Sequence, residues 1–223
     1  MRIKSASLKK TIFCDCDNSK IIDIALKLTQ GCVDEKEKAV RLFDYVKNSY
    51  KYSFGPWDLL ASQTIGLGVG MCTTKANLLV ALLRASGIPA NFKIIRIKAR
   101  EVFGKFAVFN FLKKKISEES IHIYISVYLK DGWHDIDPSL DKSLIRGLVA
   151  VGYDKSMISD WNGEGNYLNF IEPRQTISFI GEFENIDDYH KKKRKTARNL
   201  FLFMSRIIMC FYRIVGKINF IKE

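Results

Sequence analysis

The chain has 223 residues and a formal net charge of +12, with 47% hydrophobic and 27% charged residues. A chain of this length can bury one sizeable core, and this balance of apolar and charged residues argues against a disordered or fibrous protein. We therefore expect one main globular domain.

The positive charge is concentrated at the C-terminal end of the sequence. Residues 190–223 contain ten Lys or Arg against Glu223 alone, which gives this segment a net charge of +9 and leaves +3 for residues 1–189. Attraction to an anionic partner is thus an expectation for the tail alone, and a nucleic-acid-binding body is not indicated.

The five cysteines are an odd number, and no apolar signal-peptide core follows Met1. Both features favour free thiols in a reducing, cytoplasmic setting. Cys14 and Cys16 form a C-x-C pair, but the sequence has only three histidines and no second cysteine pair near it. We expect ordinary thiols there rather than a zinc site.

Two helices are predicted near the N-terminus, over residues 19–30 and 34–49. Both show helical spacing, and Asp34 is placed as the N-cap of the second. Residues 52–57, rich in Gly and aromatics, are typical of a loop. A further helix is predicted over residues 73–86, where apolar side chains on all sides indicate burial in the middle of the domain.

Strands are predicted over residues 90–99 and 121–137. In the second stretch, aliphatic residues alternate with polar or aromatic ones, which is the period of a strand with one apolar face. Asp131-Gly132 supplies a turn, after which the chain returns antiparallel. Residues 139–180 give no pattern from which we predict structure.

Cys72 stands at the first turn of the predicted buried helix, where a reactive cysteine is expected. Backbone N–H groups and the positive end of the helix dipole favour the thiolate there. Gly68 and Gly70 let a substrate or another backbone approach closely. The local pattern is equally compatible with a buried structural cysteine.

His122 is the candidate base, because the chain has only three histidines and this one lies on the polar face of the predicted strand. Asp137 lies on the same face of the hairpin and can orient the histidine, whereas His134 lies on the opposite face. The alternatives are a histidine hydrogen-bonded within its strand and an aspartate that begins an Asp-Pro turn.

The hairpin register decides whether this pair can meet. A tight two-residue turn at Asp131-Gly132 would place Asp137 opposite Ser126, four positions or about 13 Å along the strand from His122. A wider loop or a β-bulge is then needed to bring the two side chains together.

Three motifs in this order resemble the transglutaminase-like superfamily. Gly70-Met71-Cys72 through Gly87-Ile88-Pro89 resembles its nucleophile helix, His122 to Tyr128 its histidine strand, and Asp131-Gly132-Trp133 with Asp137-Pro138-Ser139 its aspartate strand. The resemblance covers about residues 35–140. It implies a papain-like α+β fold, in which a central buried cysteine-bearing helix packs with N-terminal helices on an antiparallel sheet.

The resemblance also implies a mechanism. Cys72 would attack an amide carbonyl to form a thioester, His122 would carry the proton, and Asp137 would hold the imidazole in one tautomer. The backbone N–H of Cys72 would contribute to the oxyanion hole, with Gln63 or Trp57 as second donor by analogy. No cofactor and no metal are implied.

The expected substrate is therefore a peptide or protein amide, and a hydrolase of the protease or amidase type is the favoured activity. An amine in place of water as acceptor would make the enzyme an acyltransferase. The chain is far shorter than the animal crosslinking transglutaminases and lacks their extra β domains and evident acidic calcium sites. A non-catalytic binding module that acts through the basic C-terminus is the alternative of a different class.

We divide the chain into a catalytic domain, residues 1–185, and a C-terminal segment, residues 186–223. Residues 199–219 are mostly apolar with a narrow polar stripe, which predicts a basic amphipathic helix that is too charged to span a membrane. Three interpretations remain: a helix docked on the domain, an in-plane helix on an anionic membrane surface, or an arm that binds a partner or nucleic acid. The second would place the protein peripherally at a membrane.

Overall fold

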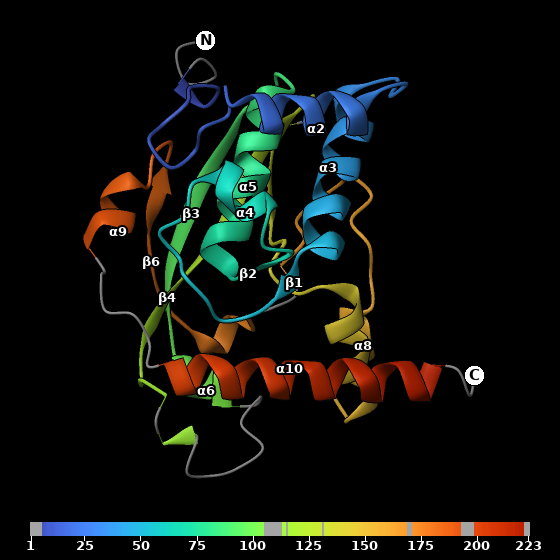
Figure 1. The fold of residues 1–223 in the computed structure, drawn as a ribbon, viewed down its shortest axis with the longest axis vertical. Helices are drawn as coiled ribbons and strands as arrows, with labels where there is room; N and C mark the ends of the chain where they lie inside the picture. The colour runs from blue at the N-terminus through green and yellow to red at the C-terminus, as the bar shows by residue number, and fades with distance from the viewer. Residues whose placement is uncertain are drawn as a thin grey trace.

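Helices pack against a four-stranded antiparallel sheet (Figure 1), which confirms the predicted α+β class. The computed structural model describes residues 6–104, 113–114, 116–130, 132–168, 171–192 and 199–220. The helices are α2 (Ser19–Thr29), α3 (Glu35–Ser49), α4 (Ala61–Ile65), α5 (Cys72–Ala85), α6 (Ala99–Phe103), α8 (Lys142–Ala150), α9 (Asp187–Lys192) and α10 (Asn199–Phe220), with 3-10 turns η2 (Lys155–Met157) and η3 (Pro173–Gln175). The strands are β1 (Lys51–Tyr52), β2 (Val69–Gly70), β3 (Ala90–Ile97), β4 (Ser120–Leu129), β5 (Gly132–Ile136) and β6 (Thr176–Phe183).

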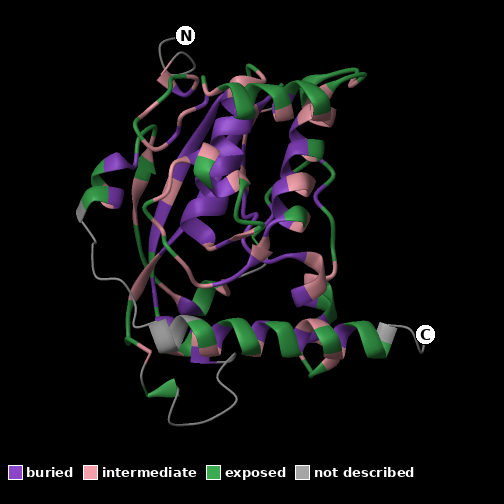
Figure 2. Cartoon of the chain, in the orientation of Figure 1, coloured by how far each residue is buried: buried purple, intermediate pink, exposed green. Residues whose placement is uncertain are grey.

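Helix α5 lies at the centre of the fold. It contacts β3 and β4 on one side and α2, α3 and α4 on the other. Every residue from Cys72 to Arg84 is buried, and Figure 2 shows the helix as an almost continuous purple element. The predicted buried central helix is therefore confirmed.

The two predicted N-terminal helices are present as α2 and α3. The Asp34 carboxylate accepts the backbone N–H of Glu37 at 2.8 Å, so this residue is the N-cap of α3 as predicted. Such a bond satisfies one of the first-turn amides that have no acceptor within their own helix. The predicted loop over residues 52–57 begins one residue later, because Tyr52 belongs to β1.

The sheet has the strand order β5-β4-β3-β6. Strand β6, which pairs antiparallel with β3, was not predicted, because most of it falls in residues 139–180. Most of its side chains are exposed or half-buried, so it lacks the aliphatic run that marks a core strand. An edge strand of this kind leaves little hydrophobic pattern in the sequence.

The β4–β5 hairpin turns one residue earlier than predicted. Leu129 pairs with Gly132, so the connection consists of residues 130 and 131, the second of which lies outside the described residues. The prediction placed Asp131-Gly132 at the centre of the turn. Gly132, with a φ of +133°, is instead the first residue of β5.

This register moves Asp137 two positions closer to His122. Ser126 pairs with Asp135, and continuing the same register places Asp137 opposite Tyr124. Residues two positions from a direct pair are diagonal neighbours on one face, about 7–8 Å apart, which is within reach of long side chains. The predicted need for a wider loop or a bulge was therefore wrong.

The C-terminal helix α10 lies along α8 at one end of the molecule (Figure 1). The backbones meet at Gly147 and Gly216, since a Cβ on Gly216 would lie 2.6 Å from the nitrogen of Gly147. Met209 and Tyr212 of α10 are buried in the same contact. Among the helices that the structure describes, none has the length and hydropathy needed to cross a membrane.

Candidate active site

Cys72 is the first residue of α5 and directly follows Met71, the N-cap. Parallel pairing of Tyr52 with Gly70 holds the chain just before it. The side-chain hydroxyl of Thr74 accepts the N–H of Met71 at 3.0 Å and so fixes the first turn. The Cys72 thiol is therefore held at a helix N-terminus, as the sequence indicated, and only 4% of the residue is exposed.

The site lies where two apolar clusters meet. The buried leucines of α5 belong to the cluster that fills the space between the helices and the sheet, whereas Met71 packs against a second cluster. On β4, Ile123 belongs to the first cluster and Tyr124 to the second, and His122 directly precedes them. Apolar side chains thus surround the site and exclude water from it.

The structure brings His122 and Asp137 together. His122 Nε2 lies 2.9 Å from Asp137 Oδ2, and both side chains are buried. A carboxylate can only accept hydrogen bonds, so Nε2 is the donor. The imidazole is therefore fixed in one orientation, and Nδ1 is the nitrogen through which it exchanges a proton.

Ser139 holds the carboxylate of Asp137 from the other side. Its backbone N–H and its hydroxyl both donate to Asp137 Oδ1, at 2.9 Å and 2.5 Å. Ser139 was not among the predicted site residues, although an aspartate two residues before a serine is the pattern of a local Asx turn. Asp137 therefore both begins a turn, which was the alternative interpretation, and contacts the histidine.

Cys72 and His122 lie close enough for each to shift the pKa of the other. Burial acts to raise the pKa of the thiol, but the hydrogen bond and positive charge of His122, together with the backbone N–H of Ile123, lower it below its usual value. The structure thus brings the three predicted residues into one chain of contacts, and the environment favours the thiolate that acts as a nucleophile.

The pKa values of His122 and Asp137 are shifted in opposite directions. Burial acts to lower the pKa of His122, but the charge and hydrogen bond of Asp137 outweigh it and raise that pKa. Burial acts to raise the pKa of Asp137, but His122 and the hydrogen bonds from Ser139 lower it. The environment therefore favours an imidazolium between two anions.

A buried lysine lies one turn along α5 from Cys72. Lys75 Nζ donates to the carbonyl oxygens of Lys47 at 3.0 Å, Tyr50 at 2.8 Å and Ser139 at 2.8 Å. Burial lowers the pKa of this amine to about 7, against the charges of nearby carboxylates. Lys75 therefore joins the end of α3, the cysteine-bearing helix and the loop that follows Asp137, a connection that the sequence analysis missed.

Tyr52 is a further residue beside the site that the sequence analysis missed. It is fully buried, and burial, followed by the charges of Cys72 and Asp137, raises the pKa of its hydroxyl well above the usual value. The hydroxyl therefore stays protonated next to the two anionic groups. No sequence signal distinguishes this tyrosine from the chain's other eight, because the short β1–β2 pairing positions it.

The other candidate residues make contacts elsewhere. Gln63 is exposed, and its side-chain oxygen accepts the N–H at the start of α4 at 3.0 Å. The ring of Trp57 lies 6.4 Å from the ring of His190 in α9. His134 Nδ1 lies 3.1 Å from a backbone carbonyl. The backbone N–H of Cys72 remains the predicted oxyanion donor, since a first-turn amide has no acceptor within its helix.

Cys14 and Cys16 are both buried, and their proximity raises the pKa of Cys14 and lowers that of Cys16. Arg84 Nη1 lies 3.9 Å from the sulfur of Cys14. Within the segments that the structure describes, His, Cys, Asp and Glu do not gather in any group of three or more with the spacing to hold a metal ion.

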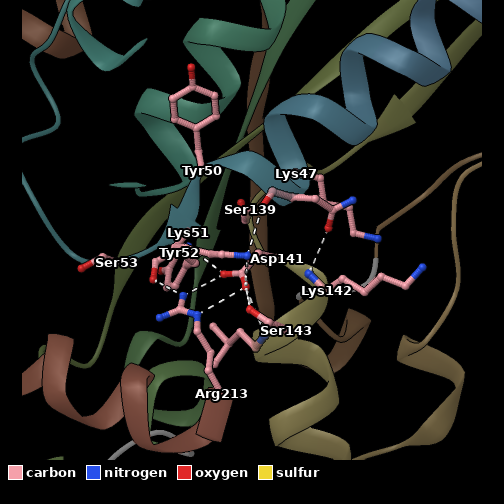
Figure 3. A network of polar contacts seen from close by, with 12 residues as sticks. Lys47, Tyr50, Lys51, Tyr52, Ser53, Ser139, Asp141, Lys142, Ser143 and Arg213 are labelled. Atoms are coloured by element: carbon pink, nitrogen blue, oxygen red, sulfur yellow. Dashed lines mark hydrogen bonds and ion pairs between the residues drawn. The ribbon is translucent and has the colours of Figure 1, made fainter. Parts of the chain in front are cut away.

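A polar network connects α10 to the loop after the triad (Figure 3). Asp141, which is fully buried, accepts the N–H of Tyr52 at 2.9 Å and Arg213 Nη2 at 2.7 Å. Arg213 also donates to the Tyr52 carbonyl at 2.8 Å. Burial acts to raise the pKa of Asp141, but Arg213 holds it far below its usual value. Of the three interpretations of the C-terminal segment, the structure shows a docked helix.

Comparisons with known proteins identify a family. The sequence model of the transglutaminase-like superfamily matches residues 22–138. No curated protein matches the chain. Among solved structures, the chain is similar to a candidate cysteine protease from Cytophaga hutchinsonii, at 22% identity and a TM-score of 0.48, over 61% of this chain and 42% of that one.

Two more distant structures are also similar. One is a candidate protease from Parabacteroides distasonis, at 15% identity and a TM-score of 0.38, over 60% of this chain and 26% of that one. The other is red sea bream transglutaminase, at 12% identity and a TM-score of 0.37, over 92% of this chain and 42% of that one. In all three cases the match covers less than half of the solved structure's length.

Proposed function

This chain belongs to the transglutaminase-like superfamily, and we propose that it is a cysteine-dependent enzyme that hydrolyses amide bonds in peptides or proteins. The observation that supports the proposal most is the chain of contacts from Cys72 through His122 to Asp137, with 2.9 Å between Nε2 and Oδ2. A thiol, a base and an orienting carboxylate in this order are the requirement for acyl transfer through a covalent intermediate.

In the first half of the reaction, Cys72 gives its proton to His122 and the thiolate attacks the carbonyl carbon of the amide. The C–N bond then breaks, and the nitrogen leaves with the proton that His122 held. The product is a thioester on Cys72 and a free amine. The lowered pKa of Cys72 and the raised pKa of His122 both favour this ion pair before attack.

In the second half, water attacks the thioester carbon while His122 takes one of its protons. The C–S bond breaks, a carboxylic acid is released, and the thiol–imidazole pair is restored. Asp137 keeps Nε2 as the donor throughout, so Nδ1 carries the proton in both halves. An amine in place of water would give a new amide by the same steps.

The burial of Cys72 favours a second candidate, a non-catalytic binding module. With only 4% of the residue exposed, a substrate carbonyl reaches the sulfur only after neighbouring residues move. An enzyme needs that movement, and a binding module does not. The two candidates therefore differ in whether substrate opens the site.

Isotope labelling of products separates these candidates. We would incubate the full chain with a protein digest in H₂¹⁸O, with and without a tagged primary amine, and analyse the peptides by mass spectrometry. Hydrolysis predicts ¹⁸O in new carboxyl groups, and an acyltransferase predicts the tag instead. Cys72→Ala should abolish the product, whereas Cys210→Ala, at an exposed cysteine, should not.

A thiol probe provides the independent readout. In a Cys32→Ser/Cys210→Ser background, which removes the two cysteines that are not buried, an iodoacetamide-based probe should label Cys72 at neutral pH. Equal labelling with and without a further Cys72→Ala change, together with no labelled product from the digest, would contradict the enzyme and leave the binding module.

A further inference from the structure

The outer face of α10 carries a row of large apolar side chains, each between 48% and 60% exposed. We call this row the α10 stripe. Its members are Phe203, Ile207, Phe211, Ile214 and Ile218. They follow one another at intervals of three or four residues, so they lie on one side of the helix. From the first to the last, the row is about 22 Å long at 1.5 Å per residue.

The opposite side of α10 packs against the rest of the protein. Met209 and Tyr212 are buried against α8, Arg213 reaches the buried Asp141, and Gly216 is in contact with the backbone of α8. An ordinary surface helix has one apolar side, which faces the core, and a polar side that faces water. Helix α10 has a second apolar side, and Figure 2 shows its exposed surface in green along most of its length.

We propose that the α10 stripe is a docking surface for an anionic lipid membrane, on which the helix lies in the plane of the interface. A contiguous exposed apolar row of this size on a soluble domain marks an interaction site. A helix that lies in the interface buries its apolar side at the boundary of headgroups and acyl chains, with basic residues beside it. Since the described helices do not meet the requirement for spanning, the in-plane arrangement is the one that the row fits.

Charge distinguishes a lipid surface from other occupants. Arg206 and Lys217 are both exposed and each directly precedes a member of the stripe, at Ile207 and Ile218, so they lie along one edge of it. The sequence from residue 190 to residue 222 contains ten Lys or Arg and no acidic residue. Anionic headgroups are complementary to this charge.

Two other occupants fit less well. A second copy of the chain would bring two such basic segments together without any acidic residue between them, so like charges would repel. A nucleic acid would satisfy the charge but would leave the five apolar side chains of the stripe in water.

The position of α10 suits this role. The helix lies across one end of the molecule, at the opposite end from α2 (Figure 1). The glycine contact with α8 and the Arg213–Asp141 ion pair hold the helix on the body with its stripe outward. Binding would therefore not require α10 to detach.

Vesicle flotation of the full chain tests the proposal. We expect the chain to float with vesicles of phosphatidylserine and phosphatidylcholine at low salt, and to float at least tenfold less with phosphatidylcholine alone. Ile207→Ser/Phe211→Ser/Ile214→Ser should reduce flotation at least tenfold, because it removes the centre of the stripe. The matched control is Phe179→Ser on β6, where the side chain is also 58% exposed, and it should float like the wild type.

The basic edge is tested in the same way. Arg206→Glu/Lys217→Glu should reduce binding to anionic vesicles, whereas Lys20→Glu/Lys27→Glu on α2 changes the net charge equally and should have little effect. Because all these residues are exposed, the variants should unfold at the temperature of the wild type. If the stripe variant lost both its fold and its binding, flotation alone would not separate the two effects. A dye on a chain with an unaltered stripe separates them.

A dye on a cysteine reports where the membrane lies without altering the stripe. Cys210 is exposed on α10, and Cys32 is half-buried between α2 and α3. An environment-sensitive dye on Cys210, in a Cys32→Ser/Cys72→Ala chain, should shift to the blue with anionic vesicles, and the same dye on Cys32, in a Cys72→Ala/Cys210→Ser chain, should not. No shift at Cys210, a stripe variant that floats like the wild type, or a stable dimer that the stripe variant abolishes would each overturn the proposal.

Discussion

Ser139 donates two hydrogen bonds to one oxygen of Asp137, from its backbone N–H at 2.9 Å and from its hydroxyl at 2.5 Å. The other oxygen of the carboxylate contacts His122 Nε2 at 2.9 Å. Asp137 cannot rotate without breaking one of these contacts. Ser139 therefore acts on Cys72 through two intermediaries and is a positioning residue.

The first prediction concerns Ser139→Ala, which removes the hydroxyl and keeps the backbone N–H. A hydrogen bond to a charged group contributes about 1.5–3 kcal/mol, so we expect alkylation of Cys72 by iodoacetamide at neutral pH to slow by about tenfold. Without the hydroxyl donor, the pKa of Asp137 rises, and its electrostatic stabilisation of the His122 imidazolium weakens. The rate should therefore be followed across pH, in the Cys32→Ser/Cys210→Ser background.

Ser143→Ala is a matched control for this change. Ser143 donates its hydroxyl to Asp141, two residues before it, just as Ser139 does to Asp137. Because Asp141 does not contact His122 in the described contacts, this variant should keep the alkylation profile of the wild type. Equal slowing in both variants would show that Ser139 acts only through general stability.

The second prediction is the pH dependence of the thiol. Because the pKa of Cys72 is lowered, its thiolate persists below the usual thiol range, and alkylation falls only as pH drops through the lowered pKa. In His122→Gln only the backbone N–H of Ile123 still opposes the effect of burial, so the pKa of Cys72 rises. Alkylation at pH 7 should then fall at least tenfold, about one pKa unit. The matched control is His134→Gln, which should leave the profile unchanged; a shift of similar size there would contradict the assignment.

The cysteine and the histidine were predictable because each depends on local pattern. A buried helix that begins at a cysteine and a strand that alternates through His122 are both readable from side-chain periodicity, and the structure contains both. The register of Asp137 was not readable in the same way. Moving the turn by one residue moves the pairing by two, and the sequence Asp131-Gly132 is compatible with both turns.

The supporting residues were not predictable because they depend on contacts between distant segments. Lys75 contacts carbonyls that lie 25, 28 and 64 residues away in the chain, and Arg213 contacts Asp141 across 72 residues. A buried lysine or arginine has no periodic signature, since the residue type alone predicts exposure. Only the folded structure shows that these two cations are in the interior.

The third prediction concerns Lys75→Met. The folded pKa of Lys75, about 7, lies below its unfolded value, so between about pH 7 and pH 10 the unfolded chain binds a proton that the folded chain lacks. This contribution to the free energy of unfolding therefore rises with pH across that window. Lys75→Met lacks this contribution. The free energy of unfolding of the wild type, relative to that of Lys75→Met, should therefore grow from pH 7 to pH 9.5 by on the order of 2 kcal/mol.

Urea unfolding at the two pH values measures this difference. Lys51→Met is the control, because Lys51 is near the same network but its side chain is 44% exposed. The difference in the free energy of unfolding between Lys51→Met and the wild type should not change with pH over this range. If the difference for Lys75→Met were also constant, Lys75 would keep its charge in the folded state.

The fourth prediction concerns Arg213→Gln, which removes the cation from Asp141, a fully buried carboxylate. Breaking a buried ion pair by removing one partner costs about 3–5 kcal/mol. We expect about 2–4 kcal/mol here, since the side chain of Arg213 is 17% exposed. Urea unfolding at pH 7 measures the loss, and Lys217→Gln, on the exposed side of α10, should cost close to nothing.

The sign of the pH dependence provides a second test of the same pair. Because Arg213 lowers the folded pKa of Asp141, its stabilisation is fully present above the unfolded pKa, near 4, and is lost as pH falls below it. The difference in the free energy of unfolding between the wild type and Arg213→Gln should therefore be largest near neutral pH and decrease on acidification. A difference that stays constant from pH 7 to pH 3 would mean that Arg213 stabilises α10 through its hydrogen bond to the Tyr52 carbonyl and not through the charge of Asp141.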